Sequence, residues 1–386
     1  MAVFLDHAAT SPLRPEALSA LNQALLQLGN PSSIHSHGQA TREILEQARD
    51  QIANSVGCNR SEVVFSSGGT EANNQAVKGI WWSRSSSERK LIISSPLEHK
   101  ALLDPIQWLV EHEGAELVEL PISNGHVSLA ALEEILRERS QEIVLISLMW
   151  VNNETGVITD IEAVTEIAKP YGIPVHSDAI AALGRIPIDF AKSGLYAMSI
   201  SGHKVGAPIG IGALVVRRDA KPVNLIHGGG QERGLRSGTM NYSLASAFGA
   251  AAELAVRQMS ETQSRLRVLR DKIETAITAA IPSAVLTAKN SIRVEHNAHF
   301  IFPGVNNDSL LFLLDQQGIS VSAGSACQAG VLGPSHVLIG MGYSEADAAS
   351  CIRVSLGYNT TEADVDVFVN GLIEAYPKAL AASPMP

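Results

Sequence analysis

Seven short apolar runs recur between residues 63 and 216, and helix-like stretches separate most of them. The runs occupy residues 63–65, 91–93, 115–120, 143–147, 174–178, 197–200 and 212–216. Strands that alternate with helices favour βαβ units and a mostly parallel sheet. We therefore expect an α/β fold with a seven-stranded sheet, and ligand sites at the carboxyl ends of its strands.

The pattern changes near residue 256. A long amphipathic stretch spans residues 254–281, and short strands and helices follow it without the earlier alternation. A chain of 386 residues is long enough for two domains. We expect a large domain over residues 13–255 and a smaller α+β domain formed by residues 1–12 and 256–386.

Composition excludes several classes of protein. A formal net charge of −10 argues against a surface that coats nucleic acid, because phosphate binding requires an excess of basic residues. We expect no signal peptide and no membrane span, since no run of about eighteen apolar residues occurs. The cysteines Cys58, Cys327 and Cys351 have neither CxxC nor zinc spacing, so no metal site is expected. Scattered thiols are typical of a reducing compartment, and we expect a cytoplasmic protein.

A lysine and an aspartate follow two of the predicted strands. Lys204 ends a small polar turn that starts at Ser201, and Asp178 closes the run 174–178. A lysine can hold an aldehyde cofactor as a Schiff base, and a carboxylate can pair with the cofactor's protonated pyridine nitrogen. A buried carboxylate is costly unless it is paired, although a strand-end aspartate is also a common helix N-cap. The pair favours a site for pyridoxal phosphate.

Two glycine-rich segments have a composition that suits phosphate. Residues 66–71 connect a strand to a helix, where glycines permit close approach and the helix N-terminus attracts an anion. A plain strand-to-helix turn is the alternative there. Residues 228–239 hold two arginines among five glycines, and this loop would contact phosphate, with a neighbouring subunit as one location. A disordered surface loop is its alternative.

Polar residues after two other strands are further candidates. His99 follows a strand and a proline, so it would stack on an aromatic cofactor and act as an acid or base, or it is a surface-loop histidine. Asn152 and Asn153 stand at a strand end, where an amide would bond a phenolic oxygen or simply form a turn.

The three cysteines differ in their neighbours. Cys327 lies among small residues in the segment 322–330, a setting typical of an exposed, reactive thiol. Cys351 has apolar neighbours that predict a core position, and Cys58 has no catalytic context. Cys327 is therefore the candidate nucleophile. Arg353, in a strand-like segment, would grip a substrate carboxylate with two hydrogen bonds, or form a surface salt bridge.

Taken together, these motifs resemble a cysteine desulfurase of the NifS/IscS type, in the class V aminotransferase family of fold type I pyridoxal-phosphate enzymes. The resemblance runs in order through most of the chain. It is carried by nine segments, at residues 5–10, 29–33, 67–74, 98–100, 151–156, 201–204, 236–239, 324–327 and 353–357.

The resemblance implies a role for each candidate around pyridoxal 5'-phosphate. Lys204 carries the Schiff base and Asp178 pairs with the pyridinium nitrogen. His99 stacks on the ring and moves protons, and Asn153 approaches the phenolic oxygen. The phosphate is held by Gly69, Thr70, Ser201, His203 and, from the second subunit of a homodimer, Thr239.

The implied reaction removes sulfur from L-cysteine and yields L-alanine. Arg353, with Asn153, grips the substrate carboxylate, and Cys327 accepts the sulfur as a persulfide. The persulfide would pass to an acceptor protein, either a scaffold for iron–sulfur cluster assembly or an enzyme of tRNA thiolation. A class V aminotransferase, a selenocysteine lyase and a non-catalytic docking homologue are the alternatives.

The sequence departs from the family pattern at two places. Ala181 stands where the family usually has a glutamine that bonds the cofactor's phenolic oxygen. Losing one neutral hydrogen bond costs about 0.5–1.5 kcal/mol, so we expect cofactor binding to survive. The chain ends at Pro386, whereas family members that dock the iron–sulfur scaffold carry a longer tail. This difference favours delivery to tRNA thiolation or to a dedicated acceptor.

Overall fold

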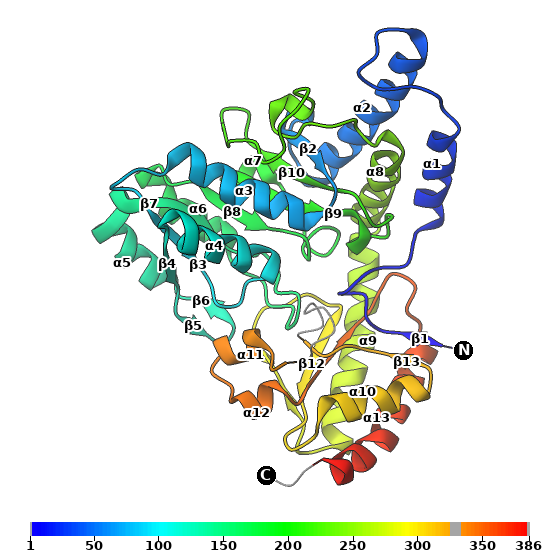
Figure 1. Cartoon of the computed structure of the whole chain (residues 1–386). Helices are drawn as coiled ribbons and strands as arrows, with labels where there is room; N and C mark the ends of the chain where they lie inside the picture. Colours follow the sequence, from blue (N-terminus) through cyan, green and yellow to red (C-terminus); the bar gives the residue numbers. More distant parts are fainter. Residues whose placement is uncertain (1, 325–332, 384–386) are drawn as a thin grey trace.

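The seven predicted strands form one sheet, which lies in the larger of two bodies (Figure 1). Four of its six strand pairings are parallel, and one strand, β10, runs antiparallel to both neighbours. The prediction of a mostly parallel, seven-stranded sheet is confirmed. The strand order is β2 (Val63–Ser66), β10 (Gly212–Val216), β9 (Ala197–Ser201), β8 (Val175–Asp178), β7 (Ile143–Ser147), β3 (Leu91–Ser94) and β4 (Glu116–Glu119). The computed structural model describes residues 2–324 and 333–383.

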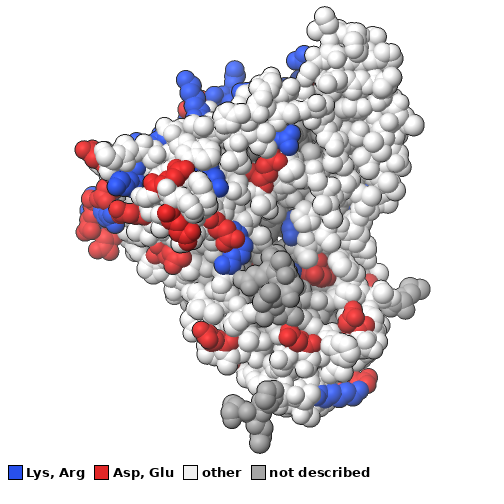
Figure 2. Space-filling model, viewed as in Figure 1, with Lys and Arg blue, Asp and Glu red and all other residues white. Residues whose placement is uncertain are grey.

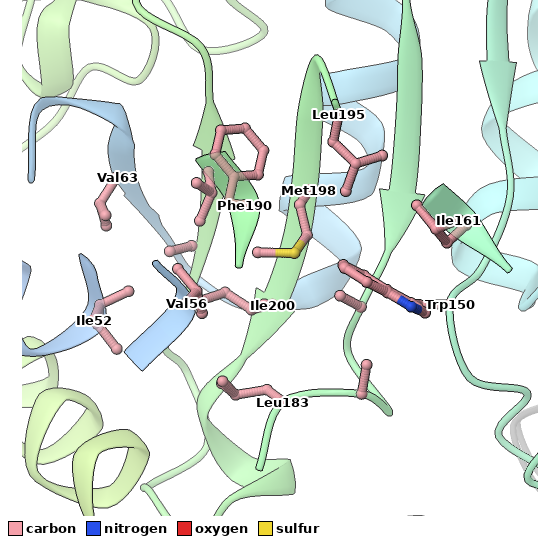
Figure 3. Close-up of a cluster of buried hydrophobic side chains, with 14 of the residues drawn as sticks. Ile52, Val56, Val63, Trp150, Ile161, Leu183, Phe190, Leu195, Met198 and Ile200 are labelled. Carbon is pink, nitrogen blue, oxygen red and sulfur yellow. The ribbon is translucent and has the colours of Figure 1, made fainter. Parts of the chain in front are cut away.

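Helices cover both faces of this sheet, because alternate side chains of each strand enter different cores. On β2, Val63 and Phe65 face one core and Val64 faces the other. Figure 3 shows the first core, where Met198 of β9 is drawn between Phe190 and Trp150, and Ile200 of the same strand beside Val56. Its helices are α1 (Pro15–Leu25), α2 (Ser36–Val56), α5 (Leu129–Arg139), α6 (Ile161–Ala168), α7 (Phe190–Ser193) and α8 (Tyr242–Arg257). The opposite core holds α3 (Gly69–Arg84) and α4 (Lys100–Glu113).

The stretch predicted as one long amphipathic segment over residues 254–281 is two helices. The first, α8, ends at Arg257, and α9 (Met259–Ala280) starts after Gln258, whose φ and ψ of −90° and 1° are not helical. Apolar periodicity continues across the break because each helix buries one face. A single non-helical residue therefore leaves little trace in the pattern.

The smaller body has a core of its own, to which the first residues of the chain contribute Val3 and Leu5. A three-stranded antiparallel sheet, in the order β11-β12-β14, forms its centre, and β1 pairs in parallel with β13. The domain limits at residues 12 and 255 stay a prediction. The elements here are β1 (Val3–Phe4), β11 (Val285–Leu286), β12 (Asn297–Ile301), α10 (Asn307–Gln316), β13 (Ile319–Ser320), α11 (His336–Gly340), α12 (Glu345–Ala348), β14 (Cys351–Ser355) and α13 (Glu362–Ala382).

The surface is unevenly charged. In Figure 2 acidic side chains gather at the end of the larger body where Figure 1 draws α5 and β4. A short hairpin of β5 (Ile122–Ser123) and β6 (His126–Val127) lies near this end. None of the helices within residues 2–324 and 333–383 has the length and hydropathy that crossing a bilayer requires.

A buried ion pair anchors the glycine-rich loop 228–239. Glu232 receives two hydrogen bonds of 2.7 Å from the Arg49 guanidinium and a third, of 2.9 Å, from the backbone N–H of Phe65. Arg236, in the same loop, forms a 2.9 Å ion pair with Glu71 on the first turn of α3. The interpretation of a disordered surface loop is therefore wrong, because the loop is tied to α2, β2 and α3.

We expect the Arg49–Glu232 pair to contribute to the stability of the folded chain. Glu232→Gln keeps an acceptor for Phe65 but removes the buried partner of the Arg49 charge, so the free energy of unfolding should fall by about 3 kcal/mol. Urea denaturation measures this change. Asp219→Asn in the exposed Arg217–Asp219 pair is the control, with an expected loss below about 1 kcal/mol. Equal losses in the two variants would contradict the anchoring role.

Candidate active site

The β2–α3 connection brings a helix N-terminus close to the ends of two other strands. The helix α3 begins at Gly69, and no side chain caps its first turn. Such a terminus presents unpaired N–H groups and the positive end of the helix dipole. A Cβ at Gly69 would lie 2.1 Å from Ile180 Cδ1 and 3.4 Å from Ser201 Cβ, so glycine permits the close approach. The turn is therefore suited to hold an anion beside β8 and β9.

Asp178 lies at the end of β8 and is 4 % exposed. Its carboxylate accepts hydrogen bonds from Asn73 Nδ2 at 2.7 Å and from the Ile180 N–H at 2.9 Å. Burial raises the pKa of this carboxyl, while these hydrogen bonds and the charges of His99 and Lys204 act in the opposite direction. A carboxylate at this depth is a strong acceptor for a cationic N–H.

Lys204 follows β9 in the short 3₁₀ turn Gly202–Lys204. Its Nζ donates to the carbonyl oxygens of Ala8 and Ala9, the latter at 2.8 Å. Ser11 adds two further contacts, from its N–H to the His203 carbonyl and from its hydroxyl to the Lys204 carbonyl, each at 2.9 Å. The first residues of the chain therefore lie against this lysine.

His99 is the N-cap of α4 and not part of a surface loop. Its Nδ1 atom accepts from the Ala101 N–H at 3.0 Å, so the neutral ring carries its proton on Nε2. His203, next to Lys204, has a pKa lowered to about 4, chiefly by burial and further by the Lys204 charge. Its ring is therefore neutral at pH 7, with one N–H to donate and one ring nitrogen that accepts.

Arg353 is 1 % exposed, which excludes the surface salt-bridge interpretation. Its guanidinium donates to the Asn153 carbonyl at 3.1 Å and to Asp6 Oδ1 at 2.8 Å. Two buried atoms here, Arg353 Nε and Asn153 Oδ1, have no hydrogen-bond partner within the described residues. Buried polar atoms are rarely left unpaired, so these two atoms indicate where a polar ligand would bind.

One cavity of about 240 Å³ brings these residues together. Ala181 lines it as well, so this position faces the same space. Thr239 is exposed and does not line it, and Cys327 lies outside the described residues. Within the described residues no cluster of three or more metal-ligating side chains occurs. The predicted site residues that line the cavity are Gly69, Thr70, His99, Asn153, Asp178, Ser201, His203, Lys204 and Arg353.

A family model described as aminotransferase class-V matches residues 3–368. The chain belongs to this family. An IscS-like cysteine desulfurase of Mycobacterium tuberculosis is 47 % identical over 384 residues, which cover 98 % of each chain. A cysteine desulfurase IscS of Dictyoglomus turgidum is 40 % identical, over 99 % of this chain and 96 % of that one. A solved structure described as a NifS-like protein superposes with a TM-score of 0.90 at 32 % identity, covering 98 % of this chain and all of the other.

Several residues of this site were not predicted from the sequence. Asn73 bonds Asp178, and Asp6 bonds Arg353, although neither was assigned a role. The carbonyls of Ala8 and Ala9 receive Lys204, and backbone acceptors leave no signature in a sequence. Asn73 follows Gly69 by one turn of α3, and this helical spacing was the one available signal.

A buried histidine on the strand that carries Asp178 predicts how stability depends on pH. On β8, His176 is completely buried between the hydroxyls of Ser147, at 2.8 Å, and Ser199, at 2.9 Å. Burial lowers its pKa to about 3. Below about pH 6.5, His176 is therefore protonated in the unfolded chain but stays neutral in the folded chain. The free energy of unfolding falls as the pH decreases below this value.

For this one histidine the loss is about 1.4 kcal/mol per pH unit. His176→Gln can keep a hydrogen bond to either serine and removes the proton uptake, so unfolding free energy should fall less steeply between pH 6 and pH 4 (about 1.4 kcal/mol per unit less). Urea titrations at several pH values measure the slope. The exposed His112→Gln is the control, and an unchanged slope in His176→Gln would contradict the assignment.

Proposed function

We propose that this chain is a pyridoxal-phosphate-dependent cysteine desulfurase that converts L-cysteine to L-alanine and leaves the sulfur on Cys327 as a persulfide. The supporting observation is the cavity that joins Lys204, Asp178, His99 and Arg353, in a chain 47 % identical to an IscS-like cysteine desulfurase over 98 % of its length. The persulfide would then pass to an acceptor protein of iron–sulfur cluster assembly or tRNA thiolation, in the cytoplasm.

The lining of the cavity fits the cofactor of the family. Asp178 offers a buried carboxylate to the protonated pyridine nitrogen, and Lys204 offers the amine that binds the aldehyde. Asn153 Oδ1 is buried without a partner, and the N-terminus of α3 suits a phosphate. The phosphate would be held by Gly69, Thr70, Ser201 and His203, with Thr239 of a second subunit.

The chain's own groups have distinct tasks in this reaction. When bound, the cofactor withdraws electrons from the substrate, which makes the Cα proton acidic and the Cβ–S bond labile. Arg353 would bind the substrate carboxylate, and Nζ of Lys204 would take the Cα proton. His99 Nε2 carries a proton that it can transfer within the cavity.

Sulfur transfer belongs to Cys327. Its thiolate forms a bond to the substrate sulfur as the Cβ–S bond breaks, and the electron pair of the broken bond stays with carbon. Protonation of that carbon completes alanine, and the second sulfur remains on Cys327 as a persulfide. Cys351 is suited to no such task, because it is 1 % exposed and burial raises its pKa to about 11.

Turnover of L-cysteine by wild type and single-thiol variants tests the assignment. Cys327→Ala should lower formation of both alanine and sulfide, in the presence of a thiol reductant, at least about a hundredfold. Cys351→Ala is the matched control and should retain most activity, since its thiol is buried and protonated.

The outcomes separate the alternatives. Alanine production that does not depend on Cys327 would assign the site to a lyase of the selenocysteine type. Conversion of L-cysteine to its 2-keto acid, without alanine, would assign it to an aminotransferase. A cofactor-loaded protein without turnover would point to a docking homologue.

We also propose that two copies of the chain form a dimer through the region that joins α1 and α2. Leu26, Leu28 and Ile34 there are 84 %, 79 % and 91 % exposed. Figure 2 shows this end of the molecule as almost free of charge on the face in view. A hollow of about 590 Å³ lies beside it, between α2 and the loop that leads to Thr239. Apolar surface of this kind next to a hollow is typical of a protein interface.

Substitution in this region tests the dimer. Leu28→Asp should raise the dimer dissociation constant at least about tenfold, because it places a charge in a desolvated contact. Sedimentation equilibrium measures the constant. Phe312→Asp, at a residue of α10 that is 63 % exposed, is the control and should leave it unchanged. A wild-type monomer at micromolar concentration would overturn the proposal.

A further inference from the structure

The turn that carries Asn153 into the cavity also directs a second side chain away from it. The turn is held by Asn152, whose Oδ1 accepts from the N–H groups of Glu154, at 3.0 Å, and Thr155, at 2.9 Å. The Asn152 amide nitrogen donates to the Leu97 carbonyl at 3.1 Å. Gly156 closes the turn at a φ of +78°. Glu154 is therefore placed by a turn that is fixed on both sides.

The Glu154 carboxyl is buried, with 1 % of the residue exposed, and it is not among the residues that line the cavity. Its Oε2 atom accepts a hydrogen bond of 2.5 Å from the Ser335 hydroxyl. The same oxygen lies against Gly324, where an added Cβ would be only 2.1 Å away. Burial raises the pKa of this carboxyl, and the bond from Ser335 and nearby positive charges oppose the shift.

Gly324 immediately precedes the segment 325–332. Ser335 follows that segment after residues 333 and 334. Both therefore meet at one carboxylate oxygen. Each has a further attachment nearby. Ser322, two residues before Gly324, pairs with Arg353 through two backbone hydrogen bonds of 3.2 and 2.7 Å. His336, after Ser335, bonds the Glu98 carbonyl at 2.8 Å.

We propose that Glu154 is a positioning residue for sulfur transfer. Through its bond to Ser335 and its close contact with Gly324, it sets the positions of two residues that flank the segment of Cys327. Asn153 precedes Glu154 in the same turn. The contacts of Glu154 therefore fix Gly324 and Ser335 relative to the proposed site of the substrate carboxylate. This inference rests on the proposed desulfurase function.

Three variants and one control test it in the cofactor-loaded, full-length protein. Glu154→Ala should lower kcat for alanine formation about tenfold and leave KM for L-cysteine within about twofold, because only the reach of the thiol is affected. Ser335→Ala should have a smaller effect in the same direction. Glu154→Gln keeps an oxygen acceptor for Ser335 and should recover most of kcat. Ser350→Ala, a buried serine that bonds Ala346 instead, is the control.

A second readout needs no turnover. Alkylation of Cys327 by iodoacetamide, followed by mass spectrometry of its peptide, should be at least about threefold faster in Glu154→Ala than in wild type, because access to the thiol sets its rate. Gly324→Ala should slow turnover through contact with Glu154, and the same change should cost much less in Glu154→Ala, where space is available.

The outcomes distinguish this inference from the proposed function. Wild type without Cys327-dependent turnover would refute the desulfurase assignment itself. An active wild type, with Glu154→Ala unchanged in kcat and in Cys327 alkylation, would overturn the positioning role alone. A loss of kcat in Glu154→Ala no larger than that in Ser350→Ala would also overturn it. So would effects of Glu154→Ala and Gly324→Ala on kcat that are additive in the double variant.

Discussion

The buried carboxylate of Asp178 is the interaction on which the candidate site depends. It stands at the end of the central strand β8, and its bond from Asn73 ties that strand to α3, whose N-terminus forms the other end of the cavity. A carboxylate buried to 4 % exposure is expensive without strong partners. The strand and the helix therefore belong to one arrangement, in which Asn73 and the Ile180 N–H satisfy part of the carboxylate and leave it able to pair with a cationic group.

The rest of the cavity is completed by segments far apart in the chain. Arg353 of β14 bonds Asp6, 347 residues away, and Lys204 bonds the backbone at Ala8. The N-terminal residues thus reach Lys204, which follows a strand of the seven-stranded sheet, while Val3 and Leu5 pack in the smaller core. Such contacts couple the two cores, because moving one body would break hydrogen bonds inside the cavity.

Much of this arrangement could be predicted from residue patterns. Short apolar runs predicted each strand of the large sheet, and ligand sites fall at the carboxyl ends of parallel strands. The apolar neighbours of Cys351 correctly predicted a buried thiol. The break at Gln258 was not predicted, because two consecutive amphipathic helices repeat the same apolar period across it. Nor was the ionic anchor of Glu232 on Arg49, since an acidic residue in a glycine-rich loop is usually solvated.

By itself, the sequence determined the layered α/β architecture and the chemical types of the candidate residues, since apolar periodicity and side-chain chemistry are local properties. Only the tertiary structure decided which of them meet. The acceptors for Lys204 are backbone carbonyls, which every residue possesses, and the meeting of Gly324 with Glu154 depends on a missing Cβ. Contacts of these kinds arise from how distant segments pack, because neither a carbonyl nor an absent side chain marks its partner in the sequence.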